Sequence, residues 1–365
     1  MKLQILQENF SKSLSITSRF VSPRAQLPVL SNILLRAQGT RLYLMATNLE
    51  LSISTSIGAK IEKEGEITVP ARVLTELVSN LARGAMDLSS EQEQLTITSS
   101  GFKGSVLGLN PSEFPAIPQS ISKQAVELES KTLNKALSQV VFSASSDETR
   151  PILTGVLLVN KNTDLYLVGT DGFRLSQKRI LGAKDLDFAK TIVPKAALIE
   201  LARIATEEDK ILVEIKNEDK QVLFGVGDSI LSSRVIEGDF PPYEKIIPTA
   251  STTEVKLNRE ELLRAVKLAL VFARDGGYVG KVIVGEGQLQ ILSESSRSGS
   301  EQVSVEAKVE GPSLEILYNL HFIEEFLNCV VGEQVEIGLT NADAPGIFRD
   351  STDADFLHLI MPVKV

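Results

Sequence analysis

Two short segments have residue types and spacing that could do chemistry. Residues 170–172 read Thr-Asp-Gly, which resembles loops that carry a catalytic carboxylate, and residues 276–281 are rich enough in glycine to cradle a phosphate. However, an Asp-Gly pair between strands readily forms a tight turn, because glycine supplies a positive φ. A P-loop needs glycine where this chain has Asp275. We therefore interpret Asp171-Gly172 as a turn and 276–281 as a loop or hairpin, and keep a catalytic Asp171 as the alternative.

Other catalytic and metal-binding patterns are missing from the sequence. No Gly-x-Ser-x-Gly, His-Glu-x-x-His or Cys-x-x-Cys motif occurs, and the many carboxylates are scattered as on a solvated surface. Besides His321 and His358, the chain has a single cysteine, Cys329. Zinc and iron sites are commonly built from His and Cys side chains. The sequence therefore predicts no metal, no cofactor and no catalysis.

Composition bounds the class of protein. The 365 residues include 38 Lys+Arg against 47 Asp+Glu, are 43% hydrophobic and contain no Trp. These values are typical of a globular protein of two or three domains rather than of a disordered one. No apolar run approaches the ~20 residues that span a bilayer, and residues 1–10 do not read as a secretion leader. With one cysteine, we expect an unexported protein in the reducing cytoplasm, with no membrane partner.

The elements that must position any functional residue repeat along the chain. Four segments of the first third recur in the second third in the same order: 27–35 as 150–158, 46–52 as 169–176 with one residue added, 69–71 as 193–195, and 113–115 as 239–241. In this alignment Thr47-Asn48 occupies the place of Thr170-Asp171 and lacks the carboxylate. The repeat therefore supports the turn interpretation.

A fainter third copy completes the pattern. Residues 74–78 recur as 198–202 and again as 322–326. The period is far longer than the ~20–50 residues of a solenoid repeat, and a unit of this size can bury its own core. The sequence therefore predicts three similar domains, with limits at 1–120, 125–248 and 249–365.

Each repeat has the pattern of two helices among short strands, an α+β class. Apolar residues at helical spacing predict an early helix in every copy: Phe10, Leu14 and Val21, then Leu133, Leu137 and Val141, then Leu262, Val266 and Leu270. Strands are predicted at 152–159 and 165–170. A second helix is predicted after Pro70 and Pro194, since proline suits a helix start. The proline-containing segments 114–118 and 240–248 are predicted to be stiff linkers.

Positive charge collects on the predicted helices although the chain has a formal charge of −9. Five of the six helix windows are net basic: 8–20, 72–83, 131–142, 195–206 and 258–274. The sixth, at 321–330, is acidic. Basic helices in an acidic body could bind phosphate if they all faced one way. Lysines that only keep the helices soluble are the alternative.

Over its whole length the chain resembles the bacterial DNA sliding clamps, the β subunits of the replicative DNA polymerase III. The segments that carry the resemblance are 27–35, 46–50, 69–72, 169–176, 238–243 and 359–365. The resemblance implies three like-folded domains per chain, each with two helices packed on antiparallel sheets, and a head-to-tail homodimer. Six domains would close into a ring, with the helices lining the hole and the sheets outside.

The resemblance gives the basic helices a meaning. Duplex DNA would pass through the hole, bound without sequence preference, and the closed ring would retain it by topology. Arg24, Arg72 and Lys195 would contact the DNA backbone, with a solvated surface charge as the alternative for each. The implied function is a processivity factor that tethers the replicative polymerase. A separate ATP-hydrolysing clamp loader would be needed, because this chain has no nucleotide-binding loop.

The resemblance also implies a peptide pocket between the second and third domains, which takes a short segment carrying Gln and Leu or Phe. Its partners would be the replicative polymerase, the clamp loader, repair polymerases and mismatch-repair proteins. The matching positions here are Arg150, Leu153, Thr170, Gly172, Phe173, Arg174, Leu175, Pro241, Lys245, Ile246, Phe322, Pro345, Met361, Pro362 and Val363. Most are apolar, and the flexible Met361 suits varied ligands. Ordinary core packing is the alternative for the aliphatic members.

The chain departs from the family at several of these positions. Phe173 stands where the family often has a polar or basic residue, and Phe322 where it often has Tyr. Both changes make the pocket more apolar. For the dimer interface, the resemblance points to Val106 and Leu107 against Phe272 of a second copy.

Two other functions are compatible with the residues alone. One is an enzyme that acts on a nucleotide or polymer through Asp171, in which Asp171→Asn would abolish turnover. The other is an interaction scaffold of repeated domains that encloses no DNA. Charge reversal at Arg72 and Lys195 would leave DNA retention unchanged in a scaffold.

Overall fold

The computed structural model describes residues 1–22, 26–182, 190–205, 210–295 and 299–364. Its contacts divide the chain into two compact units. Unit 1 comprises Met1–Lys131 and Ile199–Val235, and unit 2 comprises Thr132–Leu198 and Ile236–Val365. The second third of the chain therefore contributes to both units.

The described elements of the three thirds of the chain follow one order, apart from one additional strand in the first third, β5 (Lys60–Lys63). The first contains β1 (Lys2–Leu6), α1 (Gln7–Thr17), β2 (Asn32–Gln38), β3 (Arg41–Thr47), β4 (Leu51–Gly58), β5 (Lys60–Lys63), β6 (Gly65–Pro70), α2 (Ala71–Ser79), β7 (Ala85–Glu91), β8 (Gln94–Ser99) and β9 (Phe102–Leu107). The second contains β10 (Val126–Glu129), α3 (Ser130–Val140), β11 (Gly155–Lys161), β12 (Asp164–Thr170), β13 (Arg174–Ile180), β14 (Thr191–Pro194), α4 (Lys195–Ile204), β15 (Lys210–Lys216), β16 (Gln221–Val226) and β17 (Ser229–Arg234). The third contains β18 (Thr253–Asn258), α5 (Arg259–Ala273), β19 (Val279–Gly285), β20 (Gln288–Ser295), β21 (Gly299–Glu310), β22 (Leu314–Asn319), α6 (Leu320–Cys329), β23 (Gln334–Leu339), β24 (Gly346–Asp350) and β25 (Phe356–Ile360). The predicted α+β repeat with two helices per copy is confirmed.

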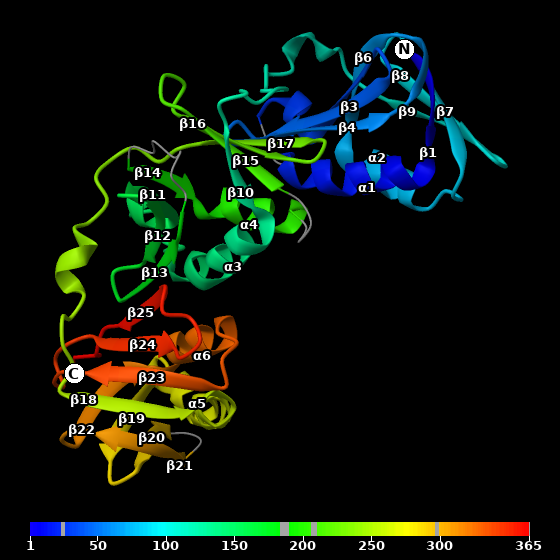
Figure 1. Cartoon of the computed structure of the whole chain (residues 1–365). Coiled ribbons are helices and arrows are strands. Elements are labelled where there is room, and N and C mark those ends of the chain that lie inside the picture. The colour runs from blue at the N-terminus through cyan, green and yellow to red at the C-terminus, as the bar shows by residue number, and fades with distance from the viewer. Residues whose placement is uncertain (23–25, 183–189, 206–209, 296–298, 365) are drawn as a thin grey trace. The chain divides into compact units, whose positions relative to one another are not determined.

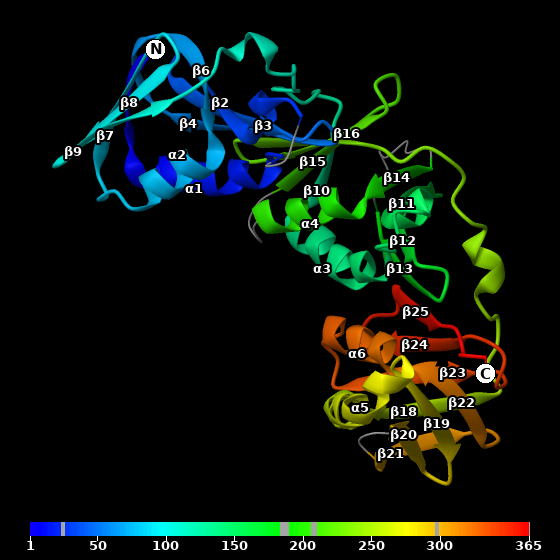
Figure 2. The same ribbon diagram turned by 180° about the vertical axis from the view of Figure 1, so that it is seen from behind.

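Unit 1 is built on two antiparallel sheets. One has the order β5-β1-β7-β8-β9, and the other has the order β10-β15-β16-β17-β4-β3-β2-β6. The second sheet is continuous between repeats, because β17 pairs with β4. Helices α1 and α2 contact each other and lie side by side in Figure 2. Phe10, Leu14 and Leu74 on their inner faces are fully buried, as expected of an apolar stripe at helical spacing.

Unit 2 is built on one long sheet, in the order β14-β11-β12-β13-β25-β24-β23-β18-β21-β20-β19-β22. Here too the sheet runs from one repeat into the next, because β13 pairs with β25. Helices α5 and α6 pack against each other beside the strands of the third repeat (Figure 1). Their inner faces, including Leu262, Val266 and Phe326, form the core of that repeat.

Local structure differs from the sequence-based expectations at four places. The strand predicted at 152–159 begins only at Gly155, because the 3₁₀ helix η5 (Pro151–Thr154) takes the first residues and proline favours a helical start. Val21 lies beyond α1, and Val141 lies in the 3₁₀ helix η4 (Val141–Ser143). The predicted linker at 240–248 contains a further 3₁₀ helix, η6 (Tyr243–Ile246).

Candidate functional site

The Asp171-Gly172 pair forms the turn between β12 and β13. The Asp171 carboxylate accepts hydrogen bonds from the backbone N–H groups of Phe173 (2.9 Å) and Arg174 (3.0 Å). Gly172 has a φ of 95°, which favours glycine. The turn interpretation is therefore confirmed, since the carboxylate is occupied in holding the turn.

Arg174 follows this turn and is the main charged residue of the site. Its side chain is 9% exposed and ion-paired with Asp171 (Nε to Oδ2, 3.0 Å) and with Glu325 of α6. Nη2 donates to the Phe142 carbonyl oxygen at 2.9 Å. The guanidinium also lies 4.3 Å from the ring centre of Phe322, a cation–π distance. Two carboxylates and an aromatic face thus compensate a nearly buried cation.

Arg150 attaches the η5 segment to the same turn. Its Nη1 donates to the Asp171 carbonyl oxygen at 2.9 Å, and its Nε is ion-paired with Asp147 at 3.0 Å. A Cβ on Gly172 would lie 3.3 Å from that Nη1. The close approach explains why glycine suits this position for a second reason besides its φ. Leu153, three residues after Arg150, is half-buried.

The C-terminal segment, residues 361–363, also contacts the β12–β13 turn. The Met361 N–H donates to the Phe173 carbonyl oxygen at 2.8 Å, and the Val363 N–H donates to the Leu317 carbonyl oxygen at 2.8 Å. Pro345 directly precedes Gly346, which pairs with Ile360, the neighbour of Met361 in the chain. The side chains of Met361, Pro362 and Val363 are only half-buried.

The η6 segment contributes the remaining predicted positions. Pro241 and Lys245 are exposed, and Ile246 is 43% exposed. Tyr243, in contrast, is buried in a core cluster with Leu175. The residues predicted for the pocket thus lie on six segments of unit 2 that contact one another or share this core.

At the rim, the apolar side chain of Phe173 is 60% exposed. Thr170, Leu175 and Arg174 instead are nearly buried and shape the site from within. The Thr170 hydroxyl donates to the Arg174 carbonyl oxygen at 2.6 Å. The exposed apolar side chain of Phe173 and the nearly buried cation of Arg174 together suit a peptide segment that has apolar side chains and also polar groups that need hydrogen-bond partners.

Sequence reasoning missed the partners that hold this site in place. Glu325 and Phe142 contact Arg174, and Tyr243 packs behind Leu175. A weak signal for Tyr243 was available, because an aromatic residue within a proline-rich segment suggests an anchored rather than a free linker. Glu325 gave no such signal, since exposed and ion-paired glutamates look alike in a sequence.

The three positions predicted to contact DNA are placed differently. Arg72 is exposed on the first turn of α2. The Lys195 ammonium donates to the Ala144 carbonyl oxygen at 3.0 Å, and burial together with the nearby Arg174 lowers the pKa of Lys195. Arg24 lies outside the described residues.

The positions predicted for a dimer interface lie at the edge of a sheet and on a helix. β9 is the last strand of the five-stranded sheet, where Val106 is buried and Leu107 is 75% exposed. A groove of about 500 Å³ beside it is lined by Val73, Glu76, Leu77, Asn80, Leu81 and Phe102. Phe272 is half-buried on α5. Its helix also exposes Leu268 and Val271, which could have been noticed as apolar residues outside the buried stripe.

One pair of side chains has the geometry of a nucleophile and a base. The Ser176 hydroxyl oxygen lies 2.8 Å from Nδ1 of His358, but both residues are 0% exposed. Burial lowers the pKa of His358 to about 3, and burial raises the pKa of Cys329 to about 12. No group of three metal-binding side chains was found among the described residues. The Ser176–His358 pair is therefore structural, because no substrate can reach it.

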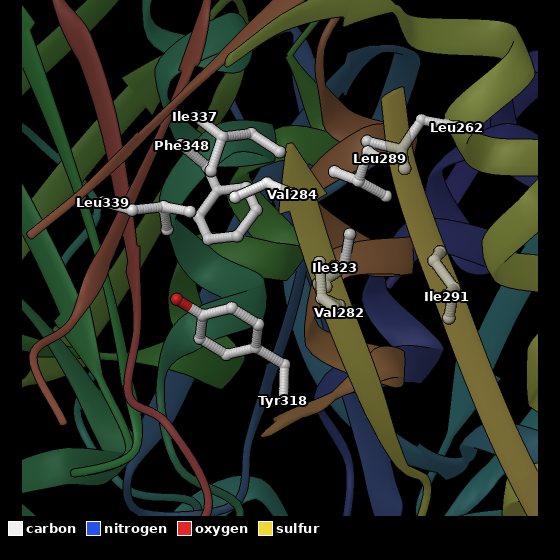
Figure 3. Close-up of a pocket in the computed structure, with 10 residues that line it drawn as sticks. All are labelled: Leu262, Val282, Val284, Leu289, Ile291, Tyr318, Ile323, Ile337, Leu339 and Phe348. Carbon is white, nitrogen blue, oxygen red and sulfur yellow. The ribbon is translucent and has the colours of Figure 1, made fainter. Parts of the chain in front are cut away.

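A cavity lies in the core of the third repeat (Figure 3). It has a volume of about 10 Å³, and its lining is apolar except for the Tyr318 hydroxyl. Burial raises the pKa of Tyr318. Such a volume accommodates about one water molecule, so the cavity is no ligand site.

No helix in the described part of the chain is long and apolar enough to cross a membrane.

Comparison with known proteins matches the whole chain. Sequence profiles of the DNA polymerase III beta subunit match in three consecutive pieces, the N-terminal domain over residues 1–118, the central domain over 127–242 and the C-terminal domain over 244–364. The chain is 32% identical to the beta sliding clamp of Synechocystis sp., with 100% of both sequences covered.

Solved structures are similar over the same length. The DNA polymerase sliding clamp of Bacillus subtilis has a TM-score of 0.94 at 27% identity, covering 100% of this chain and 99% of that one. The sliding clamp of Bartonella birtlesii bound to griselimycin has a TM-score of 0.94 at 29% identity, with both chains fully covered.

Proposed function

The chain belongs to the DNA polymerase III beta subunit family, and we propose that it is a processivity factor that encircles duplex DNA and tethers the replicative polymerase. The observation that carries this proposal is the full-length match to relatives named beta sliding clamp, in three pieces that repeat one order of elements. The protein itself is non-catalytic. The alternative enzyme is not supported, because the Asp171 carboxylate is occupied by the turn.

The ring would be a head-to-tail homodimer of domains 1–120, 125–248 and 249–365. One surface would be the edge of β9 with Leu107 and the neighbouring groove on unit 1. The other would be the exposed apolar residues of α5 on unit 2 of the second copy, with Leu268 and Val271 beside Phe272. Two different surfaces that meet in this way close a ring when the rotation between copies allows it.

DNA would be held by weak backbone contacts and by ring closure. Arg24, Arg72 and Lys195 are the proposed contacts, and the exposed Arg264 and Lys267 of α5 add positive charge of the same kind. Contacts of this type are sequence-independent and weaken with salt. Retention, in contrast, depends on the ring staying closed. With DNA as its partner, the protein would act in the cytoplasm.

The surface around Arg174 would be the peptide pocket. Its support is the convergence of the predicted positions around the β12–β13 turn, including the contacts of Arg150, Arg174 and Met361. The partners would be the replicative polymerase, the clamp loader, repair polymerases and mismatch-repair proteins, each presenting a short segment with Gln and Leu or Phe. Sharing one pocket would make these partners compete.

The proposal is tested by the length of DNA that the cognate polymerase synthesises in one binding event. The reaction contains a primed circular template, the cognate clamp loader and ATP. We expect the protein to lengthen the products greatly and its solution mass to be near twice 39.7 kDa. The Phe173→Asp variant, with a charge at the pocket rim, should give short products. Product lengths unchanged by the wild-type protein would refute the function.

A further inference from the structure

Lys161, at the end of β11, lies in a cage of polar and aromatic groups. Its ammonium donates a hydrogen bond to the Tyr243 hydroxyl at 2.8 Å and forms an ion pair with Glu244. It also lies 4.9 Å from the ring centre of Tyr166 and 5.1 Å from that of Tyr243. A lysine at an ordinary exposed site has no such set of partners.

Both principal partners of Lys161 belong to η6. The backbone hydrogen bonds of this segment are local: Tyr243 N–H to Pro241, Lys245 N–H to Pro242 and Ile247 N–H to Glu244. Among the described contacts, the segment is therefore held to the sheet by side chains. The buried ring of Tyr243 provides the apolar part of this attachment, and Lys161 provides the polar part.

The attachment has a consequence for the residues that follow. Lys245 and the 43% exposed Ile246 come directly after Tyr243 and Glu244 in the same 3₁₀ turn. A 3₁₀ helix is short and has weak internal hydrogen bonds, so the position of these two side chains depends on where the first half of the turn is fixed. Lys161 binds Tyr243 and Glu244, the first two residues of η6, and thereby fixes the first half of the turn.

We propose that Lys161 is a positioning residue of the peptide pocket, which sets the place of Ile246 and Lys245 through Tyr243 and Glu244 without touching the peptide. The inference rests on the proposed function of this surface. Its ligand would be an apolar peptide segment, for which an ordered wall costs less entropy on binding than a mobile one.

The test is a double-mutant cycle on the full-length protein. Binding of a fluorescein-labelled peptide Gln-Leu-Ala-Leu-Phe is measured by anisotropy for the wild type, Lys161→Met, Ile246→Ala and the double variant. We expect Lys161→Met to weaken binding about five- to twentyfold in the wild-type background and hardly at all once Ile246 is truncated, since coupled residues are non-additive. Glu244→Gln, at an exposed carboxylate, should show a weaker effect in the same direction.

The matched control is Lys256→Met. Lys256 forms a 2.7 Å ion pair with Glu336 and its side chain is 48% exposed, and neither residue belongs to the proposed pocket. Its loss should leave peptide binding unchanged. Equal affinities of the Lys161→Met and Lys256→Met variants would overturn the inference, as would additive effects of Lys161→Met and Ile246→Ala. Failure of the wild type to bind the peptide would instead refute the pocket itself.

Discussion

The Asp353→Asn substitution should destabilise unit 2 strongly. The Asp353 carboxylate accepts hydrogen bonds from Lys178 of β13 (2.5 Å) and Gln139 of α3 (3.1 Å), and it forms a 2.8 Å ion pair with Lys135. Asp353 itself precedes β25, so this cluster joins the second repeat to the third. The carboxylate is thus the shared acceptor of a junction between two repeats.

The size of the loss of unfolding free energy depends on the lysine charges that remain without their carboxylate partner. The side chain of Lys135 is 47% exposed and can return to water, whereas that of Lys178 is only 8% exposed. Removing one partner of a buried ion pair costs about 3–5 kcal/mol, because the other charge stays uncompensated. We expect a loss of unfolding free energy of this size for Asp353→Asn.

The assay is urea unfolding followed by circular dichroism, because the chain has no Trp. The matched control is Asp355→Asn, two residues along the chain. Asp355 pairs with Arg179, and their side chains are 25% and 40% exposed, so its loss should cost about 1 kcal/mol or less. If Asp353→Asn costs no more than Asp355→Asn, the reasoning about the buried junction is wrong.

Three further predictions follow from single positions. Leu107→Asp should weaken the dimer at least about tenfold, measured by sedimentation, because burying an unpaired carboxylate costs more than ~1.4 kcal/mol; an unchanged dimer would exclude this surface. Gly172→Ala should cost about 1–2 kcal/mol because of its positive φ, with Gly276→Ala, which has open space and no positive φ, as a neutral control. Burial would raise the pKa of Asp353, but the hydrogen bonds from Lys135, Lys178 and Gln139 outweigh it and hold that pKa well below its usual range. The stability advantage of the wild type over Asp353→Asn should therefore be complete at pH 7 and shrink steadily as the pH falls below about 4, and an advantage as large at pH 2 as at pH 7 would contradict this.

Much of the fold could be predicted because its signals are local. The stripe of Phe10 and Leu14 marks α1, and the recurrence of 27–35 at 150–158 marks the repeat. The error at residue 152 arose because an apolar run looks the same in a strand and in a short 3₁₀ turn. Only the proline before it distinguishes the two.

The continuity of the sheets could not be predicted in this way. β13 pairs with β25 and β17 with β4, and both pairings join strands of different repeats. No turn chemistry links such strands, and edge pairing depends on how complete domains dock. The repeats therefore suggested independent domains, whereas the strands form shared sheets.

The site was only partly readable from the sequence for a related reason. The resemblance gave Arg174 and Phe322, and the repeat gave the Asp171 turn. The contact between Arg174 and Glu325 joins residues far apart in the chain. Glu325 can therefore be identified as the partner of Arg174 only from the folded structure. The anchoring of η6 by Lys161 is of the same kind.

The most direct measurement of encirclement compares retention of the loaded protein on nicked circular DNA with retention on the same DNA after one double-strand cut. After loading and a salt wash, we expect the protein to stay on the circle and to leave the cut molecule by sliding off its ends. Equal retention on both forms would mean that ordinary contacts, and not a closed ring, hold the DNA.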